Sequence, residues 1–168
     1  MYKFCPFCGQ SVKFFPSSHY LCESCGKSTY LNSKPTGSVI PVCGREILVS
    51  VRGIEPEKGK LDLIGGFLEL GEDPVTGAVR EFKEETGYDL NPEELKLISI
   101  ETDQYLFQGN IIYTLNPVYW LNFSKDVKLT PTDDVAELLW VSLDEPHDWA
   151  FECIKKASAK LAKILAEK

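Results

Sequence analysis

The segment spanning residues 66–88, GFLELGEDPVTGAVREFKEETGY, constrains the fold of this chain more than any other part of it. Asp73 is a residue type that caps helix N-termini, and Pro74 suits a first helical turn. Gly87 can take the left-handed conformation that ends a helix. We therefore predict a helix over residues 74–86, which would be about 20 Å long at 1.5 Å per residue.

One side of the predicted helix carries an unusual concentration of negative charge. Glu81, Glu84 and Glu85 are spaced at i, i+3 and i+4, so they cluster beside the apolar stripe of the helix. Like-charge neighbours cost roughly 0.2–0.5 kcal/mol each, and this half of the helix is already the negative end of its dipole. Mg²⁺ or Mn²⁺, which take oxygen ligands, would reverse that balance. The alternative is a solvated acidic face.

Gly77 lies one turn earlier on the same side of the helix as the glutamates. A glycine inside a helix costs about 1 kcal/mol relative to alanine. We predict that its missing side chain leaves room for a metal ion and a phosphate.

The residues around the acidic face follow a longer pattern. It reads glycine, five residues, glutamate, seven residues, then Arg-Glu-apolar-x-Glu-Glu-x-Gly-apolar, starting at Gly66. This resembles the Nudix box of the Nudix hydrolases, with Phe82 and Tyr88 in apolar positions where aliphatic residues are commoner. The resemblance implies an α/β fold, the Nudix α/β/α sandwich with a mixed β-sheet. It also implies an enzyme that hydrolyses phosphoanhydride bonds.

The resemblance implies roles for individual residues. The catalytic Mg²⁺ or Mn²⁺ ions would be bound by three helix carboxylates and one backbone carbonyl, from Glu81, Glu84, Glu85 and either Gly65 or Gly66. Arg80 and Glu72 would form an ion pair that fixes the loop against the helix, a surface charge being the alternative for Arg80.

Further candidates lie outside the box. Asp134 and Glu137 are candidates for the metal-binding or general-base residue outside the box. The alternative is an acidic turn before a strand. Similar zinc-ribbon Nudix enzymes tend to carry glutamate at both positions, so Asp134 is a departure. Arg52 ends a predicted strand and is a candidate for phosphate binding, with a surface salt bridge as the alternative. Three aromatic residues could stack on a base, although core packing is the simpler interpretation for most of them: Tyr105, Phe107 and Tyr113.

Four cysteines near the N-terminus form two CxxC pairs separated by 13 residues, Cys5 with Cys8 and Cys22 with Cys25. Two such turns can present four thiolates to Zn²⁺, which would stabilise a unit too small for a core of its own. Disulfides and a redox CxxC are the alternatives. We predict a zinc ribbon over residues 1–34 and a Nudix hydrolase domain over residues 35–168, with Cys43 and Cys153 as buried thiols.

The hydrophobic pattern predicts the remaining elements. Strands are expected at residues 37–42, 47–52, 61–64, 96–101, 105–107, 111–123 and 138–141. Pro117 inside the longest strand suggests an edge position or a bulge. The segment from Asp148 onward is expected to be a packing helix without chemistry.

The net charge of −7 argues against broad electrostatic binding to nucleic acid or to an anionic membrane. The start MYKFCPFC lacks an apolar signal-peptide region, and we expect a cytoplasmic protein. The oligomeric state stays open, a homodimer being one option.

The order of zinc ribbon and Nudix box resembles that of enzymes that cleave NADH, ADP-ribose or FAD. Where NADH pyrophosphatases carry an SQPWPFPxS-type element, this chain reads LISIETDQYLF, which argues against NADH as the preferred substrate. The leading hypothesis is cleavage of a nucleoside diphosphate linked to another moiety, of the ADP-ribose, FAD or NADH type. The alternatives are a nucleoside triphosphate pyrophosphatase and a non-catalytic nucleotide sensor or nucleic-acid module.

Overall fold

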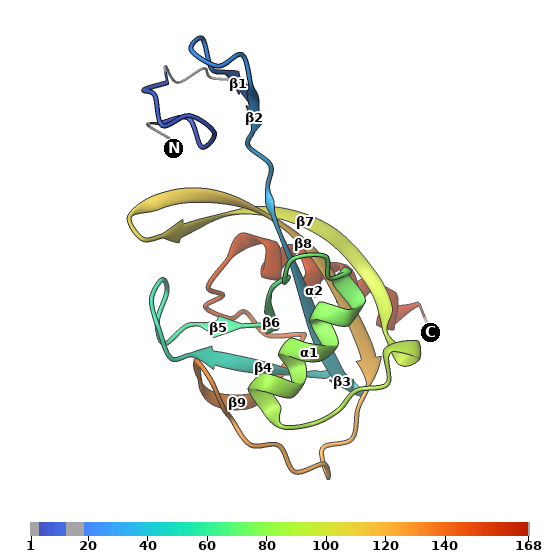
Figure 1. The fold of residues 1–168 in the computed structure, drawn as a ribbon. Coiled ribbons are helices and arrows are strands. Elements are labelled where there is room, and N and C mark those ends of the chain that lie inside the picture. Colours follow the sequence, from blue (N-terminus) through green and yellow to red (C-terminus); the bar gives the residue numbers. More distant parts are fainter. Residues whose placement is uncertain (1–3, 13–18, 168) are drawn as a thin grey trace.

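A small four-cysteine unit and a larger body built around a curled β-sheet can be followed in Figure 1. The computed structural model describes residues 4–12 and 19–167. In the small unit, strands β1 (His19–Leu21) and β2 (Ser28–Tyr30) pair antiparallel, with His19 opposite Tyr30.

The sheet of the larger body has seven strands and is mixed. Its order is β5-β4-β3-β8-β7, with β6 pairing to β3 and β9 pairing to β4. Strands β3 and β8 are parallel and the other pairs are antiparallel. The bounds are β3 Lys34–Cys43, β4 Glu46–Arg52, β5 Leu61–Asp62, β6 Ile64–Phe67, β7 Lys96–Phe107, β8 Asn110–Asn122 and β9 Val135–Ser142.

Helices cover both faces of the sheet. Helix α1 (Pro74–Thr86) packs Ala78 and Phe82 against one face, and α2 (Glu152–Ala166) packs Ile154, Ala157 and Leu161 against the other. A short 3₁₀ helix, Pro92–Glu94, follows α1. Figure 1 shows α1 in front of the sheet and α2 behind it. The α/β/α sandwich with a mixed sheet is confirmed.

Helix α1 has the bounds and caps that the sequence predicts. The Asp73 side chain accepts hydrogen bonds from the N–H groups of Val75 and Thr76, at 3.0 and 3.1 Å. Gly87 has a φ of 74° and donates its N–H to the carbonyl of Lys83. Within the described ranges, no helix is long and apolar enough to cross a bilayer.

Three strand predictions were wrong in detail. The strand expected at residues 61–64 is divided between β5 and β6, and those expected at residues 96–101 and 105–107 are one strand, β7. Pro117 does not lie at an edge, because β8 runs between β3 and β7, and the register shift of the β7–β8 ladder lies one pair away from it, between Leu97 and Ser99. The missing N–H of Pro117 is tolerated where the β3–β8 register passes from Pro35↔Leu115 directly to Ser38↔Val118. The Thr36 hydroxyl spans this interruption with a 2.8 Å hydrogen bond to Asn116.

Candidate active site

The carboxylate of Glu85 is buried where α1 meets the glycine pair of β6. The residue is 5% exposed, and its Oε2 accepts a 3.1 Å hydrogen bond from the N–H of Gly65. Gly65 has a φ of 151°, and an added Cβ would lie 2.3 Å from the Gly37 carbonyl oxygen. Glycine is therefore required for the backbone to come this close to β3 while it donates to the carboxylate.

Arg80 ties the loop before α1 to the helix itself. Its Nε and Nη2 atoms contact the two carboxylate oxygens of Glu72, each at 2.9 Å. This is the ion pair that the resemblance implied. The same guanidinium contacts Glu81 at 2.8 Å and Glu84 at 2.9 Å. Two of the three glutamates are thus paired with Arg80, whereas Glu85 has no ion pair with any described residue.

The three glutamates do not converge on one point. In the part of the chain that the structure describes, the group of side chains close enough together to hold a metal ion is that of the four N-terminal cysteines. Their ligand atoms all lie within 4.8 Å of one another. Glu81 lies against Gly66, where an added Cβ would come 2.6 Å from its carboxylate, while Glu85 contacts Gly65. Arg80 holds the carboxylates of Glu81 and Glu84, and the carboxylate of Glu85 lies apart from them at the Gly65 N–H.

Gly77 does not provide the space that we predicted for a metal ion and a phosphate. An added Cβ there would lie 2.2 Å from Leu68 Cδ2 and 2.9 Å from Glu72 Oε2. The prediction was wrong because the loop before the helix folds back over α1. The missing side chain makes room for that loop.

Of the two acidic candidates outside the box, Asp134 lies beside Glu85. Both line a small recess together with Asp62 and Arg52. Glu137 is exposed on β9 opposite Val51, and it does not line this recess. The two candidates for the general base therefore have different surroundings.

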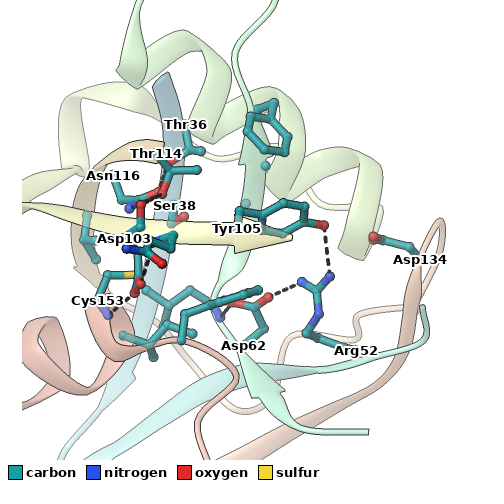
Figure 2. Close-up of a pocket in the computed structure, with 18 residues that line it drawn as sticks. Thr36, Ser38, Arg52, Asp62, Asp103, Tyr105, Thr114, Asn116, Asp134 and Cys153 are labelled. Carbon is teal, nitrogen blue, oxygen red and sulfur yellow. Dashed lines mark hydrogen bonds and ion pairs between the residues drawn. The ribbon is translucent and has the colours of Figure 1, made fainter. Parts of the chain in front are cut away.

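A cavity of about 130 Å³ opens next to this recess. A single water needs only roughly 10–15 Å³, so the space can hold a ring or several hydroxyl groups. Figure 2 shows a polar group at one end of the cavity and Arg52 at the other, with Asp134 beyond it. Gly65 and Gly66 line the cavity, which places it against the predicted carboxylate site.

Arg52 closes one wall of the cavity as part of a fixed cluster. It contacts Asp62 at 2.5 Å, the Pro56 carbonyl at 2.7 Å and the Tyr105 hydroxyl at 3.3 Å. The guanidinium also lies 5.1 Å from the centre of the Phe151 ring. The Arg52 side chain is only 11% exposed, and its charge is neutralised by the carboxylate of Asp62.

The other end of the cavity is lined by hydrogen-bonding groups from three strands. Asn116 donates to the Thr114 hydroxyl at 2.9 Å and accepts from Thr36. Asp103 accepts from the N–H of Cys153 at 2.7 Å. This bond satisfies a backbone N–H group in the first turn of α2. The N-cap residue of that helix, Phe151, offers no side-chain oxygen.

Several cavity residues were not found by sequence reasoning. Asp62 interrupts the apolar run LDLI, a pattern that could have singled it out. Asp103, Asn116 and the start of α2 are brought together only by the fold, and α2 thus contributes to the cavity beyond packing.

Of the aromatic candidates, Tyr105 lines the cavity, whereas Phe107 and Tyr113 are exposed. Cys153 is buried as expected, and Cys43 is only half-buried.

The surroundings of Glu85 fit a divalent cation. Burial raises the pKa of this carboxyl to about 9, with further contributions from the charges of Asp134, Asp62 and Glu81. The hydrogen bond from Gly65 opposes this shift. A buried carboxylate surrounded by like charges is unfavourable when ionised, and a hard cation with oxygen ligands would remove that penalty.

This shift predicts how stability depends on pH in protein free of Mg²⁺ and Mn²⁺. Between the ordinary pKa of 4.5 and about 9, the unfolded chain has released the Glu85 proton and the folded chain retains it, so stability falls as pH rises. Glu85→Gln removes this loss, and we expect its Tm to exceed that of the wild type by about 2–4 °C or more at pH 8. The difference should vanish near pH 4.5 in thermal unfolding. A Tm difference that stays constant from pH 5 to pH 9 would contradict the assignment.

The four N-terminal cysteines form a compact cluster of free thiols. The Sγ atoms of Cys5 and Cys25 lie 3.7 Å apart, as do those of Cys8 and Cys22. The backbone N–H of Cys25 lowers the pKa of Cys22 to about 7. Although the Gln10 backbone lowers the pKa of Cys8, desolvation and hydrogen bonds from the other three cysteines raise it to about 12. The four residues could hold a metal ion, which would favour the thiolate form of all of them.

Most of the chain matches a known family. Residues 33–163 match the NUDIX domain, and the chain therefore belongs to the Nudix family. This is the family that the sequence pattern predicted, and the match to the curated relative spans about a quarter of that relative's length.

Similar proteins agree with this assignment. A mouse protein described as an ADP-sugar pyrophosphatase is 44% identical over 57 residues, which are 30% of this chain and 26% of the mouse protein. A NUDIX hydrolase structure from Nitrosomonas europaea is 25% identical with a TM-score of 0.64, covering 99% of this chain and 92% of that one. A MutT NUDIX hydrolase from Burkholderia pseudomallei is 21% identical with a TM-score of 0.66, covering 77% and 98%. The last likeness concerns the fold alone.

Proposed function

We propose that the protein hydrolyses the pyrophosphate bond of a nucleoside diphosphate linked to another moiety, of the ADP-ribose or FAD type, with Mg²⁺ or Mn²⁺. The observation that carries this proposal is the cavity beside Glu85. Its lining combines hydroxyl and amide groups with carboxylates, and its one arginine is neutralised by Asp62. Such a lining suits the hydroxyl groups of a sugar better than a third phosphate.

Three glutamates and one backbone segment would hold the reacting groups, and an ion pair would fix the loop beside them. Glu81, Glu84 and Glu85 would bind the divalent cations, together with a carbonyl of Gly65 or Gly66. When bound, the cations neutralise the phosphate oxygens and lower the pKa of an attacking water. Arg80 keeps the loop in place through Glu72.

The chemical step is the addition of water to one phosphorus with cleavage of the bridging P–O bond. Asp134 lies beside Glu85 and is the residue that we propose to accept the proton of the water. Arg52 serves as a fixed wall of the substrate pocket. For ADP-ribose, the products would be AMP and ribose 5-phosphate.

The mouse relative's description as an ADP-sugar pyrophosphatase supports this substrate class. The four-cysteine unit, residues 1–34, is proposed to hold one Zn²⁺ with a structural role, beside a hydrolase domain over residues 35–168.

Product analysis tests the proposed function directly. Purified protein with Mg²⁺ is incubated with ADP-ribose, FAD, NADH and the nucleoside triphosphates, and the products are separated by ion-exchange chromatography. We expect AMP from ADP-ribose or FAD at a kcat/KM at least about tenfold above that for any triphosphate. Release of pyrophosphate from triphosphates with ADP-ribose and FAD intact would overturn the proposal. If the protein binds these anhydrides but cleaves none of them, the catalytic role would be overturned as well.

A further inference from the structure

We propose that Thr132 is a positioning residue, which fixes the loop carrying Asp134 to the end of the glutamate helix and thereby sets Asp134 against Glu85. The proposal rests on the proposed function, because it concerns the same catalytic site. It assigns a role to a residue that lies outside the Nudix box.

The end of α1 is held almost entirely by this loop. A helix leaves its last four carbonyl groups without partners inside the helix. The carbonyl of Lys83 accepts from the N–H of Gly87 at 2.8 Å. The other three accept from the loop between β8 and β9, at Thr130 and Thr132.

Thr132 makes two of these three contacts. Its N–H donates to the carbonyl of Glu85 at 3.1 Å, and its hydroxyl donates to the carbonyl of Glu84. The backbone carbonyls that it binds therefore belong to two of the proposed metal-binding glutamates. The N–H of Thr130 adds a 3.0 Å bond to the carbonyl of Thr86.

The path from Thr132 to Asp134 is short and is held from the other side. Asp133 takes a left-handed conformation with a φ of 57°, and the carbonyl of Thr132 accepts from Val135 at 3.2 Å, so the chain turns sharply. The carbonyl of Asp134 accepts from the N–H of Gly53 at 2.7 Å. Asp134 is thus clamped between α1 and the end of β4, in the recess that it shares with Glu85.

A carboxylate that manages a proton must be placed to within a fraction of an ångström, since a displacement of about 1 Å can cost roughly 10²-fold in rate. Thr132→Val removes the hydroxyl and keeps the β-branched shape. We expect kcat for the best substrate to fall by about 10- to 100-fold, while KM changes by less than about threefold because Thr132 itself does not line the cavity. Thr132→Ser, which restores the hydroxyl, should recover most of the lost kcat.

Two variants separate this role from a general effect on the loop. Thr130→Val makes the same change two residues earlier, where the side chain is exposed and the contact with α1 is made by the backbone N–H, and we expect near wild-type kcat. Gly53→Ala perturbs Asp134 from the opposite side, because its Cβ would lie 2.5 Å from the Asp134 carbonyl oxygen. It should also lower kcat more than it changes KM.

The decisive measurement is a double-mutant cycle with Asp134→Asn. If Thr132 acts through Asp134, adding Thr132→Val to Asp134→Asn should lower kcat by less than about threefold further. Wild-type kcat in Thr132→Val, an equal loss in Thr132→Ser, or full multiplicative losses in the double variant would each overturn the inference. These outcomes leave the proposed function standing, whereas a wild-type enzyme inactive on every anhydride would remove that function itself.

Discussion

Replacing Glu85 by glutamine should lower kcat of the proposed hydrolysis by about 10³-fold, the loss expected when a group that stabilises transition-state charge is removed. Glutamine fits the space and can keep the hydrogen bond from Gly65, but it cannot supply the negative charge that a hard cation requires. The measurement is steady-state kinetics with saturating Mg²⁺ on the substrate identified by product analysis.

A matched control and an independent readout make this result interpretable. Glu94→Gln makes the same chemical change at an exposed site of the 3₁₀ helix and should keep wild-type activity. The Glu85→Gln protein should be at least as stable as the wild type without divalent cations, because burial penalises the ionised carboxylate. Inactivity combined with a raised Tm would therefore exclude unfolding as the cause. Undiminished kcat in Glu85→Gln would refute the assignment of this residue to the metal site.

Loss of zinc should unfold the four-cysteine unit and leave the larger body intact. Apparent binding free energies of structural zinc reach about 10–16 kcal/mol in zinc-finger peptides, which is far more than a unit of this size gains from burial. We expect one zinc per purified chain, and none in Cys22→Ser. Limited proteolysis of that variant should cut within residues 1–34, while the transition of the sheet domain is retained in thermal unfolding.

Cys43→Ser serves as the control for this experiment, because Cys43 lies at the end of β3 and outside the four-cysteine cluster. It should retain one zinc per chain by elemental analysis. A wild-type chain without zinc, or a Cys22→Ser variant with a full equivalent of it, would contradict the zinc ribbon.

Local sequence was sufficient for α1 because every determinant lies within the helix or beside it. Asp73 accepts from its own first turn and Gly87 closes the last one, so the predicted bounds agree with the structure. The Nudix pattern identified the family for a similar reason, since its residues are held at fixed spacing by one loop and one helix. Pro117 shows the limit of local reasoning: it was expected at an edge or a bulge, but the sheet accommodates it in a central strand by an interruption of the ladder.

The substrate cavity could not be obtained in this way. Asp103, Asn116 and Cys153 come from β7, β8 and α2, and nothing in their local sequence indicates that they share one space. The sequence by itself determined the glutamate helix, the cysteine spacing and the family, since these depend on short-range geometry. Only the tertiary structure decided that Asp134 lies beside Glu85, that Asp62 neutralises Arg52 and that Arg80 holds two glutamates, because such contacts depend on how distant strands pack around one sheet.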